Sequence, residues 1–149
     1  MRAVVQRVKR AQVSVDGEEV SSIDEGLMVL VGVTDEDTKK DMEYIGNKIM
    51  GLRIFDDENG VMNVNVADSG KEIMVVSQFT LYGDARKGMR PSYIRAAKGD
   101  VSEPMYEELI AYIESKGHKV ARGRFGADMA IDMVGDGPVT ILIDSERSF

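Results

Sequence analysis

Two short segments of this chain carry groups that could take part in chemistry. Ser77-Gln78-Phe79-Thr80 follows the apolar run 73–76, and Gly137-Pro138-Val139-Thr140 opens the apolar run 139–143. Both segments are predicted to lie at the edges of strands, where main-chain and side-chain groups can face a ligand. The two segments are therefore the first candidates for a functional site.

The usual strong side-chain bases and metal ligands are scarce. The chain has no cysteine, and its only histidine, His118, stands between Lys116-Gly117 and Lys119. This setting predicts a surface loop and not a general base, so neither a Ser-His-Asp triad nor a zinc site is expected. Asp56-Asp57-Glu58 could suggest a cation site, but these residues precede Asn59-Gly60, and this pattern favours a solvated turn. The sequence predicts no metal and no cofactor.

This scarcity narrows the class of reaction. An enzyme without a histidine base, an activated thiol or a metal acts best on a substrate that is already reactive, with positioned backbone dipoles to stabilise the charge of the transition state. The ester that joins an amino acid to the terminal ribose of tRNA is such a substrate, and its neighbouring hydroxyl can help to activate water. Hydrolysis of such an ester is therefore plausible for this chain, but the scarcity of bases does not select it over other reactions.

Length and composition predict one globular domain, residues 1–149. The chain is 43% apolar and 30% charged, and it is long enough to bury a core without disulfides or metals. Charged residues interrupt the apolar ones in residues 1–7, and no apolar run approaches the length of a membrane span. A soluble, cytoplasmic protein with no membrane partner is expected.

The charge is unevenly distributed along the chain. The net charge of −7 argues against a nucleic-acid partner, because phosphate binding depends on Lys and Arg. However, residues 2–10, 86–98 and 116–124 contain basic residues and no acidic ones. If these segments meet in space, they form a basic face suited to RNA; ordinary solvated lysines and arginines are the alternative.

The apolar spacing predicts a mixed fold in which strands outnumber helices. Strands are expected over residues 2–8, 12–15, 26–33, 61–66, 73–79, 129–134 and 139–143. The spacing of residues 42–52 predicts one helix, capped by Thr34 or Asp35. A second helix is expected to start at a Ser102 cap, with Pro104 in its first turn, and to end at Gly117.

Several segments resemble the D-aminoacyl-tRNA deacylases of the D-tyrosyl-tRNA(Tyr) deacylase family, and together they cover nearly the whole chain. In order, they are residues 1–8, 26–33, 52–55, 62–64, 75–81, 88–92, 123–129 and 137–140. Any one of these segments would be weak evidence for the family, but all of them together and in this order are highly specific for it. The chain departs from the family pattern at Gly135, where asparagine is common, and at Arg122, where threonine usually stands.

The resemblance implies an α+β fold: mixed, mostly antiparallel β-sheets curved into a barrel-like layer, with two main helices packed on the outside. It implies hydrolysis of the ester bond of D-aminoacyl-tRNA, and of glycine mischarged on tRNA-Ala, with rejection of L-aminoacyl-tRNA. The implied partners are the 3′ end of aminoacylated tRNA and a second copy of the chain in a homodimer. No DNA partner is expected.

The resemblance also implies how L-substrates are rejected. In this family the Gly-Pro peptide bond is cis and enters the active site of the other subunit, so Gly137 and Pro138 are expected to form a chirality gate. Neighbouring carbonyl oxygens would hold the substrate's ammonium group and leave no room for a side chain on the L face. A gate made of backbone would accept many D-amino acids and would not exclude glycine. An ordinary trans Gly-Pro turn is the alternative.

The remaining site residues are assigned roles by the same resemblance. The catalytic pocket would be lined by Ser77, Gln78, Phe79 and Thr80, with backbone N–H groups near Phe79 forming an oxyanion hole and with Gln78 and Thr80 orienting ester and water. Phe125 would stack on the terminal adenosine, or pack in the core. Arg7 would brace the partner's Gly-Pro loop, or face solvent. Val139 and Thr140 would support the pocket.

Three functions remain open at this point. The first is a tRNA-editing hydrolase that works with assistance from the substrate. The second is a hydrolase in which Thr80 is the nucleophile and forms an acyl-enzyme, although no base to deprotonate it is visible in the sequence. The third is a non-catalytic dimeric binding module, which would tolerate replacement of Gly137 or Pro138.

Overall fold

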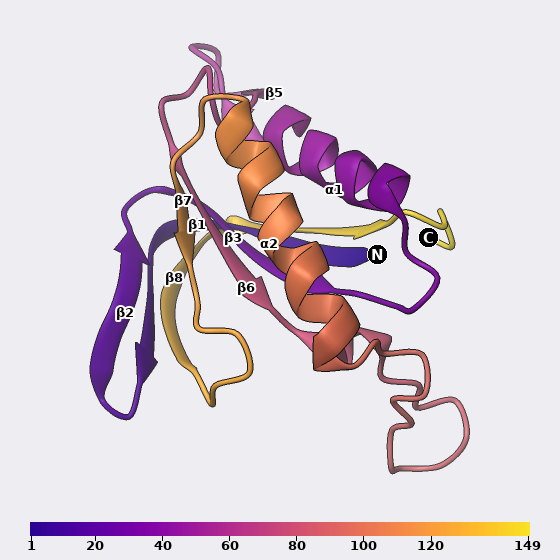
Figure 1. Ribbon diagram of the computed structural model, residues 1–149. Coiled ribbons are helices and arrows are strands. Elements are labelled where there is room, and N and C mark those ends of the chain that lie inside the picture. The colour runs from indigo at the N-terminus through magenta and orange to yellow at the C-terminus, as the bar shows by residue number, and fades with distance from the viewer.

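The long amino-terminal strand organises the sheet. In the computed structural model, which describes all residues 1–149, β1 (Arg2–Val15) pairs antiparallel with β8 (Ala130–Asp144) along almost its whole length (Figure 1). β1 also pairs antiparallel with β2 (Glu18–Ile23) and then with β3 (Gly26–Gly32). Since a strand has only two edges, β2 and β3 lie on one side of β1 and β8 lies on the other.

Parallel strands extend the sheet beyond β3. β6 (Glu72–Ser77) runs parallel to β3, and β7 (Val120–Arg122) runs parallel to β6. A small separate hairpin is formed by β4 (Phe55–Asp56) and β5 (Met62–Val64). The sheet of six strands is therefore mixed, with three antiparallel pairings and two parallel ones.

Two helices cover one face of this sheet. They are α1 (Lys39–Gly51) and α2 (Gly99–Ser115), which also pack against each other (Figure 1). A short 3₁₀ helix, η1 (Phe79–Tyr82), follows β6 directly. No helix is both long enough and apolar enough to span a membrane.

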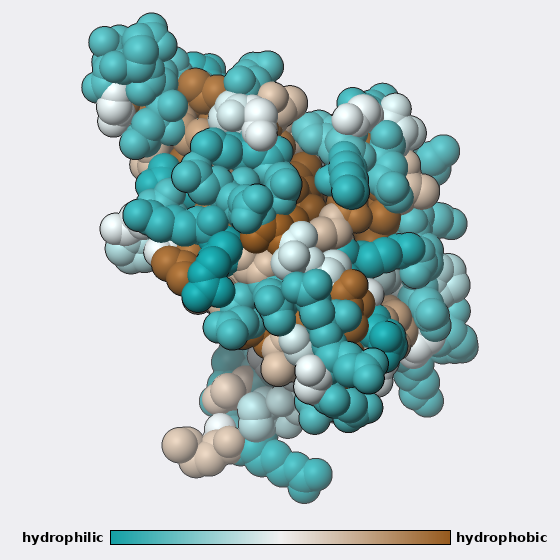
Figure 2. All heavy atoms as spheres, turned by 90° about the vertical axis from the view of Figure 1, so that its left-hand side faces the viewer, coloured by the Kyte–Doolittle hydropathy of each residue, from teal (hydrophilic) through white to brown (hydrophobic).

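Side-chain alternation along the strands creates two cores. On β3, Leu27, Val29 and Val31 join the larger cluster beneath the helices, whereas Met28 and Leu30 contribute to a smaller cluster on the opposite face. The smaller cluster includes residues from β1, β2, β6, β7 and β8, so the sheet curls around it. On the side where β2, β7 and β8 lie, apolar side chains reach the surface only in small patches between polar ones (Figure 2). The expected α+β fold, with two helices outside a nearly closed mixed sheet, is confirmed.

Both helices begin at other residues than the sequence predicted. α1 starts after Thr38, whose N–H donates to the Asp41 carboxylate at 2.8 Å. Thr34, one of the two predicted caps, instead donates its N–H to Asp37 at 2.9 Å and closes a turn. α2 starts three residues before the predicted cap Ser102, whose hydroxyl donates to the Lys98 carbonyl one turn back.

The carboxyl-terminal region also differs from the prediction in its continuity. The two strands predicted over 129–134 and 139–143 form one strand, β8. Residues before and after Gly137-Pro138 both pair with β1. The register of that pairing shifts on either side of Val8. The end of α2 is as predicted: Gly117 has a φ of +95° and its N–H donates to the Glu114 carbonyl.

Candidate active site

A cavity of about 530 Å³ opens at the carboxyl ends of the parallel strands β3 and β6. Val31 and Val33 line it from the end of β3, and Ser77, Gln78 and Phe79 line it from the end of β6. Parallel strands leave room for a ligand at their carboxyl ends. The cavity is therefore the natural place for chemistry in this fold.

The chain at the end of β6 presents an unused backbone donor beside this cavity. Gln78 is held in place because its N–H donates to the Val31 carbonyl at 2.7 Å. The next N–H, that of Phe79, donates to no acceptor in the protein. An unpaired N–H at a cavity wall is available to an anionic or carbonyl oxygen of a bound molecule.

Thr80 stands at the edge of this arrangement. Its side chain is exposed and does not line the cavity, and its hydroxyl accepts a hydrogen bond from the side-chain amide of Gln78. No histidine, carboxylate or lysine contacts that hydroxyl. The structure thus shows no base that would deprotonate Thr80.

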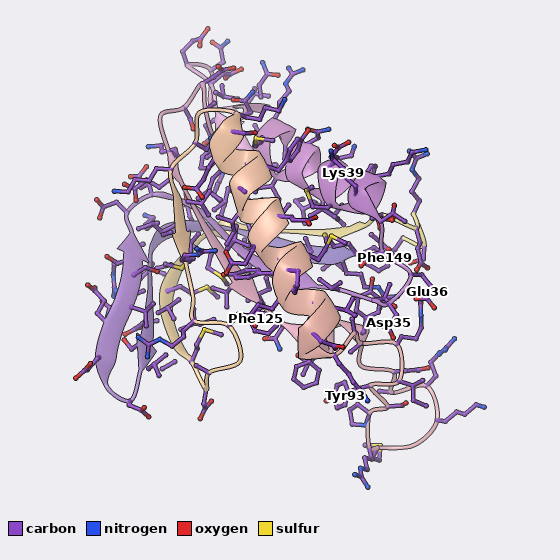
Figure 3. The ribbon with its side chains drawn as sticks, viewed as in Figure 1. Asp35, Glu36, Lys39, Tyr93, Phe125 and Phe149 are labelled. Atoms are coloured by element: carbon purple, nitrogen blue, oxygen red, sulfur yellow. The ribbon has the colours of Figure 1, made fainter.

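Aromatic rings form the side of the cavity next to α2. Tyr106 is 2% exposed, and its hydroxyl donates to the Val75 carbonyl at 2.8 Å. Burial raises the pKa of Tyr106, so this phenol is neutral and acts as a donor. Phe125 packs against it, with ring centroids 5.8 Å apart. Phe125 and Tyr93 lie at the same end of α2 (Figure 3).

The Gly137-Pro138 segment has its own supports. Its peptide bond is cis, as the resemblance implied, and both residues are exposed. The Arg7 guanidinium donates to the Ile54 carbonyl at 2.7 Å and to the Asp136 carbonyl at 3.4 Å. It also pairs with the carboxylates of Asp136, at 3.2 Å, and Asp56, at 3.6 Å. Arg7 therefore ties this segment to the turn that enters β4.

The contact of Arg7 lies within one protomer, whereas the resemblance placed Arg7 against the partner's loop. The side chain is 10% exposed and is occupied by the acceptors of its own chain. A contact with a partner stays a prediction.

The predicted residues fall into two groups that do not meet in one protomer. Ser77, Gln78, Phe79 and Phe125 share the cavity, whereas Arg7 and the 137–140 segment line no part of it. Arg7 pairs with Leu27, four residues before Val31 on β3, which puts the groups about 13 Å apart along the strand. Val139 packs against the larger core, and Thr140 is exposed opposite Gln6 on β1.

Sequence reasoning missed Tyr106 as a cavity residue. The sequence of this helix predicts an apolar stripe of Met105, Leu109, Tyr112 and Ile113, but the buried side chains are Tyr106, Leu109, Ile110 and Ile113. This set follows the i, i+3, i+4, i+7 spacing of a helix face, and that spacing was the signal available. Ala97, Gly99, Ser102 and Met129 also line the cavity, and no pattern in the sequence marked them as site residues.

The three basic segments do not form one face. Lys116 and Lys119 lie beyond the carboxyl end of α2, and the 86–98 segment precedes its first turn, so the 17-residue helix separates them by about 25 Å. Arg122 is paired with Glu107. Because α2 holds two of the segments at its opposite ends, the structure favours the second alternative left open by the sequence, which is ordinary solvated lysines and arginines.

The two departures from the family pattern lie within strands, and Gly135 lies where the register shifts. Gly135 pairs with Val8 in the ladder between β1 and β8, and a Cβ added there would meet nothing within 4 Å. Arg122 ends β7, and its carbonyl accepts from the Ser21 hydroxyl at 2.6 Å. Neither departure touches the cavity wall.

The fold is already known from solved structures. The chain matches a structure described as c-Myc DNA Unwinding Element Binding Protein with a TM-score of 0.92 and 40% identity, over 97% of this chain and 98% of that one. It shares its fold with a probable eukaryotic D-amino acid tRNA deacylase, with a TM-score of 0.78 and 18% identity over 95% and 97% of the two chains.

Curated relatives match along the whole chain. D-aminoacyl-tRNA deacylase of Thermosipho africanus is 52% identical over 149 residues, which is 100% of both chains. The deacylase of Parabacteroides distasonis is 54% identical over 148 residues, 99% of each chain. The model of the D-Tyr-tRNA(Tyr) deacylase family matches residues 4–144, and the chain belongs to this family.

Proposed function

We propose that this chain is an esterase that hydrolyses D-aminoacyl-tRNA to a free D-amino acid and tRNA and rejects L-aminoacyl-tRNA. The observation that carries the proposal is the cavity, whose wall is formed by the Ser77–Phe79 segment of the family pattern and which offers the free N–H of Phe79. Residues 1–149 act as one unit in this proposal, in the cytoplasm and without a metal or cofactor.

The 3′-terminal adenosine of the tRNA enters the cavity next to Phe125. A volume of about 530 Å³ with aromatic and aliphatic walls is in the range of small-ligand pockets. The Phe125 ring is only half-buried, so its exposed part is available for stacking on the base. This placement brings the aminoacyl ester towards the end of β6.

The chemical step uses backbone and substrate in place of a strong base. Water attacks the ester carbonyl carbon with help from the neighbouring ribose hydroxyl, and the carbonyl oxygen gains negative charge. The Phe79 N–H donates to that oxygen, and the Gln78 amide orients the ester and the water. The carbon–oxygen bond to the ribose then breaks, and the ribose oxygen takes up the proton that the attacking water has lost.

Stereochemical selection is assigned to Gly137 and Pro138 of a second copy of the chain. Both residues are exposed and lie away from the cavity of their own protomer, so a partner's cavity is where they can act. The outer edge of β8 is unpaired, and Leu142 and Val134 on this strand are 57% and 37% exposed. These features support a homodimer formed through the region of β8.

The gate contains only main chain, so it senses the configuration at Cα and not the identity of the side chain. D-residues turn the side chain outward to solvent, and L-residues direct it into the gate. Glycine has no side chain to be rejected. The proposal therefore includes hydrolysis of glycine mischarged on tRNA-Ala.

The decisive experiment compares D-tyrosyl-tRNA and L-tyrosyl-tRNA in a deacylation assay. We expect release of D-tyrosine, no release of L-tyrosine above the uncatalysed rate, and activity that falls as salt rises. Equal rates on both enantiomers would refute the gate. Hydrolysis of free D-aminoacyl esters and amides as well would favour the Thr80 hydrolase, and no hydrolysis at all would favour a binding module.

A further inference from the structure

A loop of residues 83–95, here called the projecting loop, extends from the body of the protein beside the cavity (Figure 1). Two hydrogen bonds between the backbones of Asp84 and Ser92, of 2.8 and 2.9 Å, close its base. The Tyr93 ring contacts Phe79 edge-on, with centroids 5.2 Å apart. Because Phe79 lines the cavity, the base of the projecting loop is fixed to the cavity rim.

The projecting loop and the three residues after it are strongly basic. Residues 83–98 contain five basic residues and one acidic residue, in a chain whose net charge is −7. Arg86 is paired with Asp84 at 2.6 Å, and this guanidinium holds the pKa of the Asp84 carboxyl well below its usual range. Arg95 is paired with Glu146. These two cations are therefore neutralised within the protein.

The cations at the tip are not neutralised. Lys87 and Arg90, on either side of the turn at Gly88 and Met89, make no ion pair and no side-chain hydrogen bond. Met89 is 100% exposed, and Ile94 is 90% exposed. Met89 lies between the two free cations and contributes nothing to the core, so the tip is suited to contact with another molecule.

The reach of the tip decides which part of a tRNA it can meet. Residues 87–90 lie two to four residues beyond the closed base, and an extended chain advances about 3.3 Å per residue, so the tip stands roughly 7–13 Å out from the rim. The terminal adenosine fills the cavity in the proposed function. The tip then lies next to the nucleotides that precede the terminal adenosine.

We propose that Lys87 and Arg90 of the projecting loop bind the backbone phosphates of those preceding nucleotides. The proposal deepens the proposed deacylase function and rests on it. RNA fits the tip because phosphates attract free cations, while sugars and bases offer apolar surface to Met89. The cavity thus holds the reacting end of the tRNA, and the projecting loop holds the strand that leads to it.

The test compares two substrates with the double variant K87A/R90A. On full-length D-tyrosyl-tRNA, kcat/KM is expected to fall about tenfold at low salt, because two phosphate contacts are lost. On D-tyrosyl-adenosine, which carries no preceding nucleotide, kcat/KM is expected to change less than about twofold, because that substrate reaches no further than the cavity. Each phosphate contact contributes about 0.7–0.9 to the slope of log affinity against log salt, so the variant's activity on the tRNA should be less sensitive to salt.

A matched control separates the loop from net charge. K116A/K119A also removes two positive charges, but it does so at the other end of α2, about 25 Å away. We expect this variant to keep nearly the parent's activity and salt dependence on D-tyrosyl-tRNA. An equal fall in both double variants would attribute the effect to overall charge and overturn the proposal.

Two further outcomes would also overturn it. Unchanged kcat/KM and salt slope of K87A/R90A on the tRNA would mean that the tip faces solvent or another partner. An equal fall on the tRNA and on D-tyrosyl-adenosine would mean that the loop only shapes the cavity.

If the parent protein hydrolyses neither ester, the proposed function fails, and the loop is judged by binding of uncharged tRNA. In that measurement, a Kd of K87A/R90A about tenfold higher than the parent's supports phosphate binding, and a Kd equal to the parent's refutes it.

Discussion

The cavity wall and the Gly137-Pro138 segment are held in place in different ways. The wall follows a central strand whose residues 73–76 are at most 1% exposed, and Gln78 is tied to β3 through its backbone. The Gly137-Pro138 segment lies on an edge strand, is exposed, and is secured mainly by Arg7. The position of the cavity wall depends on the core of the whole protein, whereas the position of the Gly137-Pro138 segment depends on a few polar contacts.

In the proposed function, this difference would separate catalysis from stereochemical selection. A wall fixed by the core keeps the Phe79 N–H in a constant position, as a preorganised oxyanion site requires. An edge segment can be altered without unfolding the protein. Substitutions there are therefore expected to change which substrate reacts while stability changes little, and the three predictions below test this division.

The largest effect is expected for Gly137→Ala. Gly137 has a φ of +121°, and an added Cβ would lie 2.8 Å from Cγ2 and 3.0 Å from the backbone N of Val139. The segment must shift to accept alanine, and a displacement of about 1 Å at a substrate-positioning group can lower the rate about 100-fold. The measurement is kcat/KM on D-tyrosyl-tRNA together with Tm, which should change little because the segment is exposed.

Gly135→Ala is the matched control for this prediction. It lies two residues upstream on the same strand, where an added Cβ has no neighbour within 4 Å. Activity close to that of the parent is expected. If both alanine variants lost activity equally, or if Gly137→Ala unfolded the protein, the division between gate and core would be wrong.

An intermediate effect is expected for Arg7→Leu. The change removes the guanidinium that bonds the carbonyls of Ile54 and Asp136. A hydrogen bond to a charged group is worth about 1.5–3 kcal/mol where it is buried, so a loss of at least about tenfold in kcat/KM on D-substrates is expected. Lysine has a single nitrogen and should restore activity only in part.

Arg10→Leu removes the same charge from the same strand, at an exposed position with no ion pair. The Arg10 variant should retain the parent's activity on D-tyrosyl-tRNA. A comparable loss in both variants would show that the positive charge near β1 matters, and not the support of the Gly137-Pro138 segment.

Much of this architecture was accessible from the sequence because its signals are local. The buried strands and the two helices follow from apolar spacing, and the end of α2 follows from Gly117. Helix starts were missed because the choice between Thr34 and Thr38 depends on which carboxylate, Asp37 or Asp41, lies within reach of each N–H. Such competition is settled by packing and not by residue type.

The candidate site was accessible only in part. Ser77, Gln78 and Phe79 were placed correctly at a strand end, but Tyr106 was missed because Met105 fits a helical stripe almost equally well. The separation of the basic segments depends on the length and direction of α2, which charge patterns do not carry. Long-range placement of this kind requires the assembled fold.

The smallest effect is expected for Thr80→Ala, and it tests the cavity side of the comparison. The Thr80 hydroxyl accepts from the Gln78 amide, outside the cavity lining, and contacts no base. An exposed hydrogen bond between neutral groups is worth about 0.5–1 kcal/mol, so kcat should fall only about two- to fivefold. Thr80→Ser keeps the hydroxyl and should match the parent.

Complete loss of activity in Thr80→Ala, together with an acyl-threonine trapped in the parent and detected by mass spectrometry, would instead make Thr80 the nucleophile. In that case the free N–H of Phe79 would stabilise two successive tetrahedral intermediates, because acylation and deacylation of the threonine would each place negative charge on the same oxygen.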